Sequence, residues 1–279
     1  RDVLSLVSYL TLPKEADPEQ TGKPTKLVPL ILDVHGGPRA RDRWGYDASH
    51  QWLANRGYAV LSVNYRASTG FGKNFINAGN GEWGRKMHDD LLDAVTWACE
   101  QGITTKDKVC IFGGSYGGYA ALVGLTMTPD VFACGVDIVG PSHLSTLMAS
   151  IPAYWTPIVN VMKTMFGVDP DTPEGKIMLK ERSPLTYCEK IVRPLLIAQG
   201  ANDPRVKQTE SDQIVAAMKA KNIPVTYALY PDEGHGFVRP ANRFSFYAIT
   251  EAFLAQHLGG RFQKMEEDME GSSLQLVEV

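Results

Sequence analysis

The sequence predicts an α/β protein, with a mostly parallel central sheet and helices on both faces. Short apolar runs of strand length recur along the chain and alternate with longer segments of helical periodicity. One such run, Val109 to Phe112, leads through glycines and a serine into a small, apolar segment suited to a helix. The 279 residues, 44% hydrophobic and 21% charged, suffice for one large domain with a well-buried core.

The N-terminal part of the chain predicts two strands separated by a loop. Residues 3–12 have the pattern of a strand that ends at Pro13. Residues 14–26 are polar and turn-rich, which is typical of an exposed loop. The apolar residues 27–34 form the second strand.

The next segments predict a helix, a strand and an amphipathic helix. Residues 47–56 suit a helix with Asp47 near its N-cap and Gly57 at its end. Residues 58–64 form a strand, and residues 87–101 carry apolar side chains at helical spacing along one stripe.

Beyond the serine turn, strands and helices alternate again. We expect strands at 131–139, 195–199 and 225–230, and helices at 210–221 and 244–258. Residues 142–183 resemble an insertion with helical spacing and no strand, in a position suited to roofing a substrate site. Residues 261–279 are acidic and lack periodicity, so we expect a mobile tail or a contact segment.

The serine turn has the pattern Gly113-x-Ser115-x-Gly117 between a strand and a helix. A sharp turn there strains the serine backbone, and side chains at the two glycine positions would collide with neighbours. The turn holds the serine oxygen above the sheet at a helix N-terminus. We interpret Ser115 as a nucleophile; the alternative is a glycine-rich turn that only links two elements.

An oxyanion site is predicted from two backbone amides. The N–H of Tyr116 follows the nucleophile at the start of the helix. The residues His35-Gly36-Gly37-Pro38 follow a strand, and their glycines allow a turn that presents N–H groups. The alternative for this second segment is an ordinary tight turn.

A serine nucleophile requires a base, and three histidines follow Ser115. His143 precedes any suitable acid, and His257 lies within the last predicted helix. His235 lies in a glycine-flanked loop directly after a strand, where this architecture places its catalytic groups. We therefore expect His235 to be the base.

The acid that orients this base is expected to be Asp203, which also follows a strand directly. Asp232 and Glu233 compete for the role, but they stand within three residues of His235, and reaching back to its ring would strain the loop. We interpret these two carboxylates as solvating the loop.

Charge and composition exclude several other classes of function. The net charge of −3 argues against nucleic acid or an anionic membrane as the main partner, and no apolar run approaches a membrane span. His88 has no second histidine at ligand spacing, so no metal is expected. The glycine spacing of this sequence matches neither the P-loop that binds phosphate nor the G-x-G-x-x-G loop that binds dinucleotides. No cofactor is implied, and the sequence leaves a homo-oligomer open.

The cysteines are widely spaced in apolar surroundings, without a C-x-x-C pair, and we expect reduced, buried thiols. They are Cys99, Cys110, Cys134 and Cys188. Because the chain starts at Arg1 rather than Met, we expect a processing boundary there. A cytoplasmic location is slightly favoured, and a secreted or periplasmic one stays open.

With these residues placed, the chain resembles the catalytic domain of the prolyl oligopeptidase family, an α/β-hydrolase, from about residue 4 to about residue 258. The branch that it resembles includes acylaminoacyl-peptidases and dipeptidyl-peptidase-like enzymes. The motifs that carry the resemblance are His35-Gly36-Gly37-Pro38, Asn64-Tyr65-Arg66-Ala67-Ser68-Thr69-Gly70-Phe71-Gly72, Gly113-Gly114-Ser115-Tyr116-Gly117-Gly118-Tyr119, Asp203-Pro204-Arg205-Val206 and Glu233-Gly234-His235-Gly236-Phe237.

The resemblance implies a catalytic domain over residues 1–260, a tail over 261–279, and the triad Ser115, Asp203 and His235. It also implies that the amides of Tyr116 and Gly37 bind the oxyanion, and that Arg205 contacts substrate carbonyls. The expected substrate-binding residues are Arg205, Tyr116, Val206, Trp155 and Met148.

Three departures from the family qualify the expected substrate range. The propeller that precedes the family's hydrolase domain is absent from this chain, so peptide selectivity is in doubt. Lys207 stands where the branch often has proline. Arg39 adds a positive charge beside the oxyanion loop, which would favour anionic substrates.

The expected function is a serine hydrolase that cleaves peptide or acyl-peptide bonds through an acyl-enzyme. One alternative is a carboxylesterase that acts on small acyl or aromatic esters with the same residues. An alternative of another class is a non-catalytic binding module with a hydrolase fold.

Overall fold

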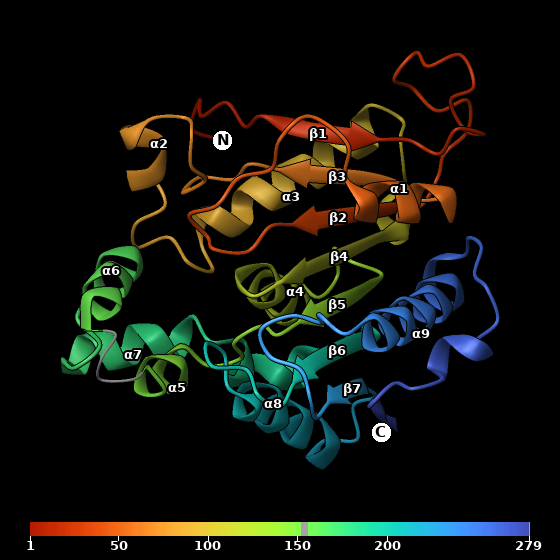
Figure 1. The fold of residues 1–279 in the computed structure, drawn as a ribbon. Coiled ribbons are helices and arrows are strands. Elements are labelled where there is room, and N and C mark those ends of the chain that lie inside the picture. The colour runs from red at the N-terminus through yellow and green to blue at the C-terminus, as the bar shows by residue number, and fades with distance from the viewer. Residues whose placement is uncertain (152–155, 279) are drawn as a thin grey trace.

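The structure, a computed structural model, describes residues 1–151 and 156–278. Its centre is an eight-stranded sheet with the order β1-β3-β2-β4-β5-β6-β7-β8 (Figure 1). The edge strands β1 and β8 run antiparallel to their neighbours, and all other pairs are parallel. The strands are β1 (Ser8–Thr11), β2 (Leu30–Val34), β3 (Ala59–Val63), β4 (Val109–Gly114), β5 (Cys134–Ile138), β6 (Leu195–Gly200), β7 (Thr226–Tyr230) and β8 (Gln275–Glu278).

Helices flank the sheet on both faces, as the sequence predicts. They are α1 (Ala48–Asn55), α2 (Lys73–Asn77), α3 (Lys86–Glu100), α4 (Tyr116–Met127), α5 (Leu144–Ala149), α6 (Thr156–Phe166), α7 (Pro173–Glu181), α8 (Gln208–Ala220) and α9 (Pro240–Leu258). Short 3-10 segments occupy Lys106–Lys108, Pro184–Lys190 and Glu267–Met269. No helix within the described ranges has the length and hydrophobicity that crossing a membrane requires.

The core lies in two layers, one on each face of the sheet. On one face, Leu53 of α1 and Ile249 and Leu254 of α9 pack against strand residues such as Val60 and Val136. These strands are buried on both faces, which explains their nearly continuous apolar sequences.

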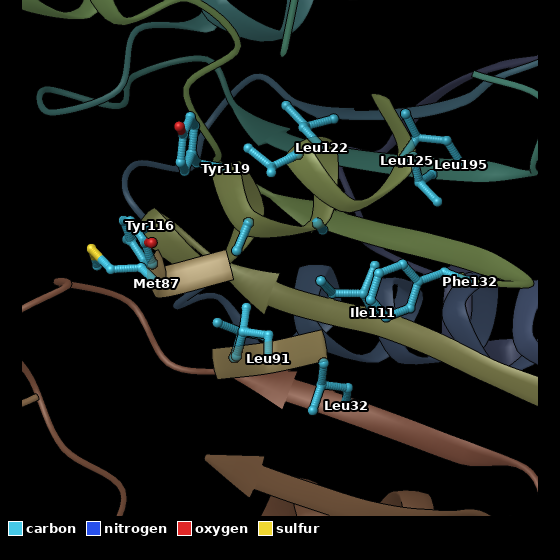
Figure 2. Packing of buried hydrophobic residues seen from close by; sticks show 14 of the residues in the cluster. Leu32, Met87, Leu91, Ile111, Tyr116, Tyr119, Leu122, Leu125, Phe132 and Leu195 are labelled. Atoms are coloured by element: carbon cyan, nitrogen blue, oxygen red, sulfur yellow. The ribbon is translucent and has the colours of Figure 1, made fainter. Parts of the chain in front are cut away.

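The opposite layer is formed by α3, α4 and α8. Figure 2 shows Leu32, Leu91 and Ile111 in this layer, where Phe132 and Ile111 both approach Gly124 of α4. A side chain at Gly124 would lie within 2.9 Å of the Phe132 ring, so α4 packs closely on the sheet through its small residues. This close packing fixes the helix that begins next to Ser115.

Residues 142–183 contain α5, α6 and α7, and no strand occurs in the parts of this range that the structure describes, 142–151 and 156–183. Figure 1 shows these helices gathered on the side toward which the parallel strands point. Ligands of open α/β sheets bind at this carboxyl edge. The three helices therefore stand beside the expected site.

Two features differ from the sequence expectation. The predicted strand 3–12 contracts to Ser8–Thr11, since only these residues pair with β3. Residues 261–279, expected as a mobile tail or contact segment, contribute β8, which pairs with β7 from Leu229↔Gln275 to Thr226↔Glu278. Much of this segment therefore belongs to the sheet and its surroundings.

Candidate active site

Ser115 stands between the end of β4 and the start of α4. Its backbone has φ 58° and ψ −116°, a combination that residues other than glycine rarely adopt. Such strain persists only where the surrounding structure imposes it, and it is concentrated at functional sites. The strained residue is thus the same serine that the Gly113-x-Ser115-x-Gly117 motif marks.

The glycines on either side of Ser115 are required by the carbonyl of Val34. A Cβ on Gly117 would lie 2.0 Å from the Val34 oxygen, and a Cβ on Gly113 would lie 2.6 Å from it. Both distances are far below van der Waals contact. The collision expected at these two positions therefore has a specific partner, the last residue of β2.

The loops after β6 and β7 carry Asp203 and His235 and are bound to each other by hydrogen bonds. The N–H of Ala201 donates to Tyr230 O at 3.0 Å, and the N–H of Asn202 donates to Glu233 O at 2.8 Å. Asn202 also donates its side-chain amide to Pro231 O at 2.8 Å. The two loops thus form one unit at the carboxyl edge of the sheet.

Within this unit, Nδ1 of His235 lies 2.6 Å from Oδ2 of Asp203. The other oxygen, Oδ1, accepts the amides of Arg205 at 2.8 Å and Val206 at 2.9 Å. The carboxyl group is fully buried, whereas 15% of the histidine side chain is exposed. A carboxylate held in this way selects the Nδ1–H tautomer and leaves Nε2 free to accept a proton.

Ser115 and His235 line one cavity of about 390 Å³. Across the described part of the chain, the one hydrogen bond of the His235 ring goes to Asp203, and none joins the ring to Ser115. Hydrogen bonds between catalytic groups are often long without substrate and shorten when it binds. The structure thus brings the predicted acid and the predicted base into contact, and Ser115 lines the same cavity as His235.

The cavity wall is mainly apolar, with a cation at its rim. The residues that line it besides Ser115 and His235 are Gly36, Gly37, Trp83, Tyr116, Pro141, Leu147, Ile151, Ile158, Met162, Arg205 and Val206. A larger cavity of about 660 Å³ lies at the opposite edge, against the starts of β6 and β7 and the end of α9. Its size does not make it the reaction site, because open α/β sheets bind ligands at the carboxyl ends of their strands.

The two residues that carry the predicted oxyanion donors, Gly37 and Tyr116, both line the cavity. Gly37 lines it with φ +121°, a conformation that favours glycine. The N–H of Tyr116 belongs to the first turn of α4, where amides have no acceptor within the helix. A Cβ on Gly36 would lie 3.3 Å from the Cβ of Ser115, so this loop passes close to the serine.

Polar contacts of His35 hold the glycine loop in place. Nε2 of His35 lies 2.9 Å from the hydroxyl of Ser68, and the Tyr65 hydroxyl donates to His35 O at 2.7 Å. The His35 and Tyr65 rings stack at 4.4 Å. Burial lowers the pKa of His35, which keeps this ring neutral within the network.

Of the predicted substrate residues, Tyr116, Val206 and Arg205 line the cavity. The Tyr116 ring meets Trp83 edge-on at 4.6 Å, and burial raises the pKa of its hydroxyl well above the usual value. Arg205 is exposed, and no ion pair of its guanidinium is found among the described residues. It is therefore available to a ligand.

The other two predicted substrate residues, Met148 and Trp155, are not confirmed as part of the cavity wall. Met148 packs against the core rather than lining the cavity, because the adjacent Leu147 of α5 faces the cavity instead. Trp155 lies outside the described residues. Ile151, Ile158 and Met162 come from the segment expected to roof the site, but helical spacing alone did not show which of its residues face the serine.

Trp83 is a cavity residue that the sequence reasoning missed. It lies between α2 and α3, far from every motif, and packs on Tyr116 and on Phe166 of α6. The neighbouring Gly81 donates its N–H to Met165 O at 2.8 Å, which ties this loop to α6. No local pattern marks Trp83, because its position depends on contacts between distant segments.

Of two expectations about charged groups, the one about Glu233 needs correction. Glu233, interpreted as loop solvation, is only 3% exposed and accepts hydrogen bonds from Val238 N and Arg239 N. Arg39, expected to attract anionic substrates, donates to Asn80 Oδ1 at 3.0 Å and is not among the residues that line the cavity. Glu233 therefore organises its loop instead of solvating it, whereas the preference for anionic substrates stays a prediction about the charge of Arg39.

Comparisons with known proteins agree with the geometry. The family model described as "Prolyl oligopeptidase family" matches residues 44–261. Dipeptidyl aminopeptidase BIII of Pseudoxanthomonas mexicana is 65% identical over 98% of this chain and 40% of its own length. Dipeptidyl peptidase family member 6 of Caenorhabditis elegans is 50% identical over 98% of this chain and 39% of its own length.

Among solved structures, a puromycin-hydrolyzing peptidase of Mycobacterium tuberculosis matches with a TM-score of 0.79 and 29% identity. The match covers 94% of this chain and 38% of that chain. The chain therefore spans about two fifths of the length of these relatives.

Proposed function

We propose that this chain, which belongs to the prolyl oligopeptidase family, is a serine peptidase that cleaves peptide or acyl-peptide bonds through an acyl-enzyme. The observation that carries the proposal is the pair of Asp203 and His235, hydrogen-bonded at 2.6 Å beside the strained Ser115. The order of elements supports the proposal, because Ser115 follows β4, Asp203 follows β6 and His235 follows β7 in the parallel part of the sheet.

In the proposed acylation step, the oxygen of Ser115 attacks the carbonyl carbon of the scissile bond while its proton passes to Nε2 of His235. Asp203 remains ionised and stabilises the imidazolium through Nδ1–H. The amides of Tyr116 and Gly37 bind the oxyanion of the tetrahedral intermediate. The carbon–nitrogen bond then breaks, and the leaving amine takes the proton from His235.

In the deacylation step, water replaces the amine. His235 accepts a proton from the attacking water, and the acyl carbon forms its new bond to the hydroxyl oxygen. The intermediate collapses, and His235 returns the proton to the oxygen of Ser115. The products are a carboxylic acid, an amine and the free enzyme.

For the substrate, we propose short peptides whose first dipeptide is released. Two relatives at 65% and 50% identity are named for dipeptidyl peptidase activity. The apolar wall formed by Trp83, Tyr116 and Val206 suits an apolar side chain next to the scissile bond, and Arg205 suits a peptide carbonyl.

A matched set of substrates tests this proposal. We expect a dipeptidyl p-nitroanilide with a free amino terminus to be cleaved faster than its N-acetylated form and faster than a single aminoacyl p-nitroanilide. Preference for the N-acetylated form would favour acyl-peptide release instead. Turnover of the corresponding p-nitrophenyl ester without any turnover of the anilides would replace the peptidase by a carboxylesterase.

A fluorophosphonate probe separates an enzyme from a binding module with the same fold. We expect the probe to label the protein and Ser115→Ala to lose both labelling and hydrolysis. If Ser115→Ala retained hydrolysis, Ser115 would not be the nucleophile.

A further inference from the structure

The loop that carries His235 is closed by a buried carboxylate. Glu233 stands two residues before His235, and its side chain accepts the amides of Val238 at 3.0 Å and Arg239 at 2.8 Å. These donors follow the histidine and lead into α9, so the carboxylate bridges the loop from one end to the other. A charge this deeply buried is stable only with such donors, and the N-terminus of α9 adds a favourable dipole.

A second buried residue connects this carboxylate to the rest of the protein. Asn242, in the first turn of α9, is 1% exposed. Its Nδ2 donates to Glu233 Oε1 and to Asp232 Oδ1, both at 2.9 Å. One side-chain amide thus holds two consecutive residues of the His235 loop.

The other atom of the Asn242 amide binds the C-terminal segment. Its Oδ1 accepts the N–H of Ser273 at 2.9 Å and the hydroxyl of Ser272 at 3.1 Å. The Ser273 hydroxyl also donates to Asp232. Asn242 therefore lies between the His235 loop and residues 272–273.

The C-terminal segment is itself held in two places. The hydroxyls of Ser272 and Ser245 of α9 lie 2.7 Å apart. Two residues beyond Ser273, β8 begins to pair with β7, the strand that leads into the His235 loop. Figure 1 shows the C-terminus beside β7. The C-terminal segment thus contacts both β7, which leads into the His235 loop, and α9, which follows that loop.

We propose that Glu233 and Asn242 are positioning residues for His235, and that Ser272 and Ser273 of the C-terminal segment complete the network that holds them. This inference rests on the proposed function, in which His235 is the base. None of the four residues lines the cavity, so they act on the reaction through the histidine loop and not by contact with substrate.

The physical reason is the narrow geometric tolerance of proton transfer. A displacement of about 1 Å at a reacting group costs about 100-fold in rate, even when the cause lies far from the bond that breaks. The Asp203 side of the pair is fixed by its own amide donors. The His235 side depends on the loop, and the loop depends on Glu233 and Asn242.

The principal test is Asn242→Asp, which keeps the shape of the side chain but replaces its donor atom by an acceptor. The new carboxylate would face Asp232 and Glu233 without a proton to share, while its other oxygen still accepts from Ser272 and Ser273. In the full chain, we expect kcat to fall about 10- to 100-fold. We expect KM to change less than about twofold, since substrate contacts stay intact.

The matched control is Asn55→Asp, the same change at an exposed position of α1, which we expect to leave kcat and KM unchanged. The rate of fluorophosphonate labelling should fall with kcat in Asn242→Asp, because it reports Ser115 reactivity without a peptide substrate. Thermal unfolding measured in parallel ensures that each variant is assayed well below its Tm.

The C-terminal side of the network is tested by the double variant Ser272→Ala/Ser273→Ala. We expect a smaller fall in kcat, since the Ser273 N–H remains, and recovery in Ser272→Thr/Ser273→Thr, which restores the hydroxyls. If Asn242→Asp does not fold, the comparison of the alanine and threonine double variants tests by itself whether the network positions His235.

A folded Asn242→Asp with the kcat of the unchanged protein would overturn the inference, and so would a loss confined to KM. If Asn242→Asp does not fold, equal kcat in the alanine and threonine pairs would overturn it. Ser115→Ala, assayed alongside, separates the two proposals. If it stays active, the proposed function fails; if it is inactive while the network variants are fully active, only the present inference fails.

Discussion

The carboxyl group of Asp203 and the imidazole of His235 lie 32 residues apart in the chain, yet Oδ2 and Nδ1 are 2.6 Å from each other. The contact follows from the parallel pairing of β6 with β7, which brings the two following loops side by side. A carboxylate that also accepts two backbone amides cannot turn away from the ring. The pair is therefore preorganised before a substrate arrives.

We expect Asp203→Asn to lower kcat about 10,000-fold, because an amide at this position no longer selects the Nδ1–H tautomer or stabilises the imidazolium. Asp232→Asn, in the same loop unit, should cost less than about 10-fold, since its carboxylate binds Asn242 and Ser273 and not the ring. Steady-state hydrolysis of one activated substrate measures both. Equal losses in the two variants would show that the acid is misassigned.

Substitution of Gly117 by alanine should destabilise the protein by at least about 3 kcal/mol, because the added Cβ meets a backbone carbonyl that cannot move aside. Gly114→Ala is the matched control: its Cβ would have no neighbour closer than 3.8 Å, so we expect a change within about 1 kcal/mol. Urea unfolding of both variants provides the comparison. A Gly117→Ala protein as stable as Gly114→Ala would contradict the close approach of Val34.

Arg205→Ala should lower kcat/KM for a dipeptidyl anilide about 10- to 100-fold, the range for losing a hydrogen bond from a charged donor. Hydrolysis of a simple acetate ester, which has no second carbonyl, should change little. Arg193→Ala removes an exposed arginine at the opposite edge of the sheet and should affect neither substrate. The same loss on both substrates would indicate a role other than recognition of the peptide carbonyl.

We expect the stability of the fold to decrease at mildly acidic pH because of His88. Burial lowers the pKa of this histidine to about 4, and the positive charge of Arg1 lowers it to a smaller extent. Its Nε2 lies 2.9 Å from the Thr128 hydroxyl, and its Nδ1 is buried without a partner among the described residues. Since the pKa of His88 in the folded state lies below the usual value of 6.5, the neutral ring makes its full contribution to the free energy of unfolding above pH 6.5. This contribution is lost as the pH falls toward 4.

The loss amounts to about 3 kcal/mol, from the free energy equivalent of the pKa shift. The difference in unfolding free energy between the unchanged protein and His88→Gln, measured from pH 7 to pH 4, isolates this residue from the other titrating groups. A difference that does not vary with pH would exclude His88 as the source.

Most of the fold follows from local patterns. The apolar runs at β2, β3, β4 and β6 are buried on nearly every residue and that at β7 on three of its five, so hydrophobicity and length identify them. The edge strand β8 escaped prediction because it is only four residues long and lies in an acidic segment, where its residues Gln275, Leu276 and Val277 are exposed and carry no strong signal. Its pairing with β7 is a contact across more than 40 residues of sequence.

For the candidate site, the amino-acid sequence by itself determined the turn at Ser115, since the pattern Gly113-x-Ser115-x-Gly117 marks a strand–turn–helix unit. The atom that excludes a side chain at both glycines, the oxygen of Val34, belongs to β2 and was identified only by the structure. The sequence also placed Asp203 and His235 after strands, where the chain reverses at the carboxyl edge of a sheet. Only the tertiary structure decided which carboxylate meets the imidazole, which side chains form the cavity wall, and that Glu233, Asn242 and the C-terminal segment surround the His235 loop. The physical reason is that hydrogen bonds and packing depend on distances between segments remote in sequence, which strand pairing and helix packing set and no local pattern records.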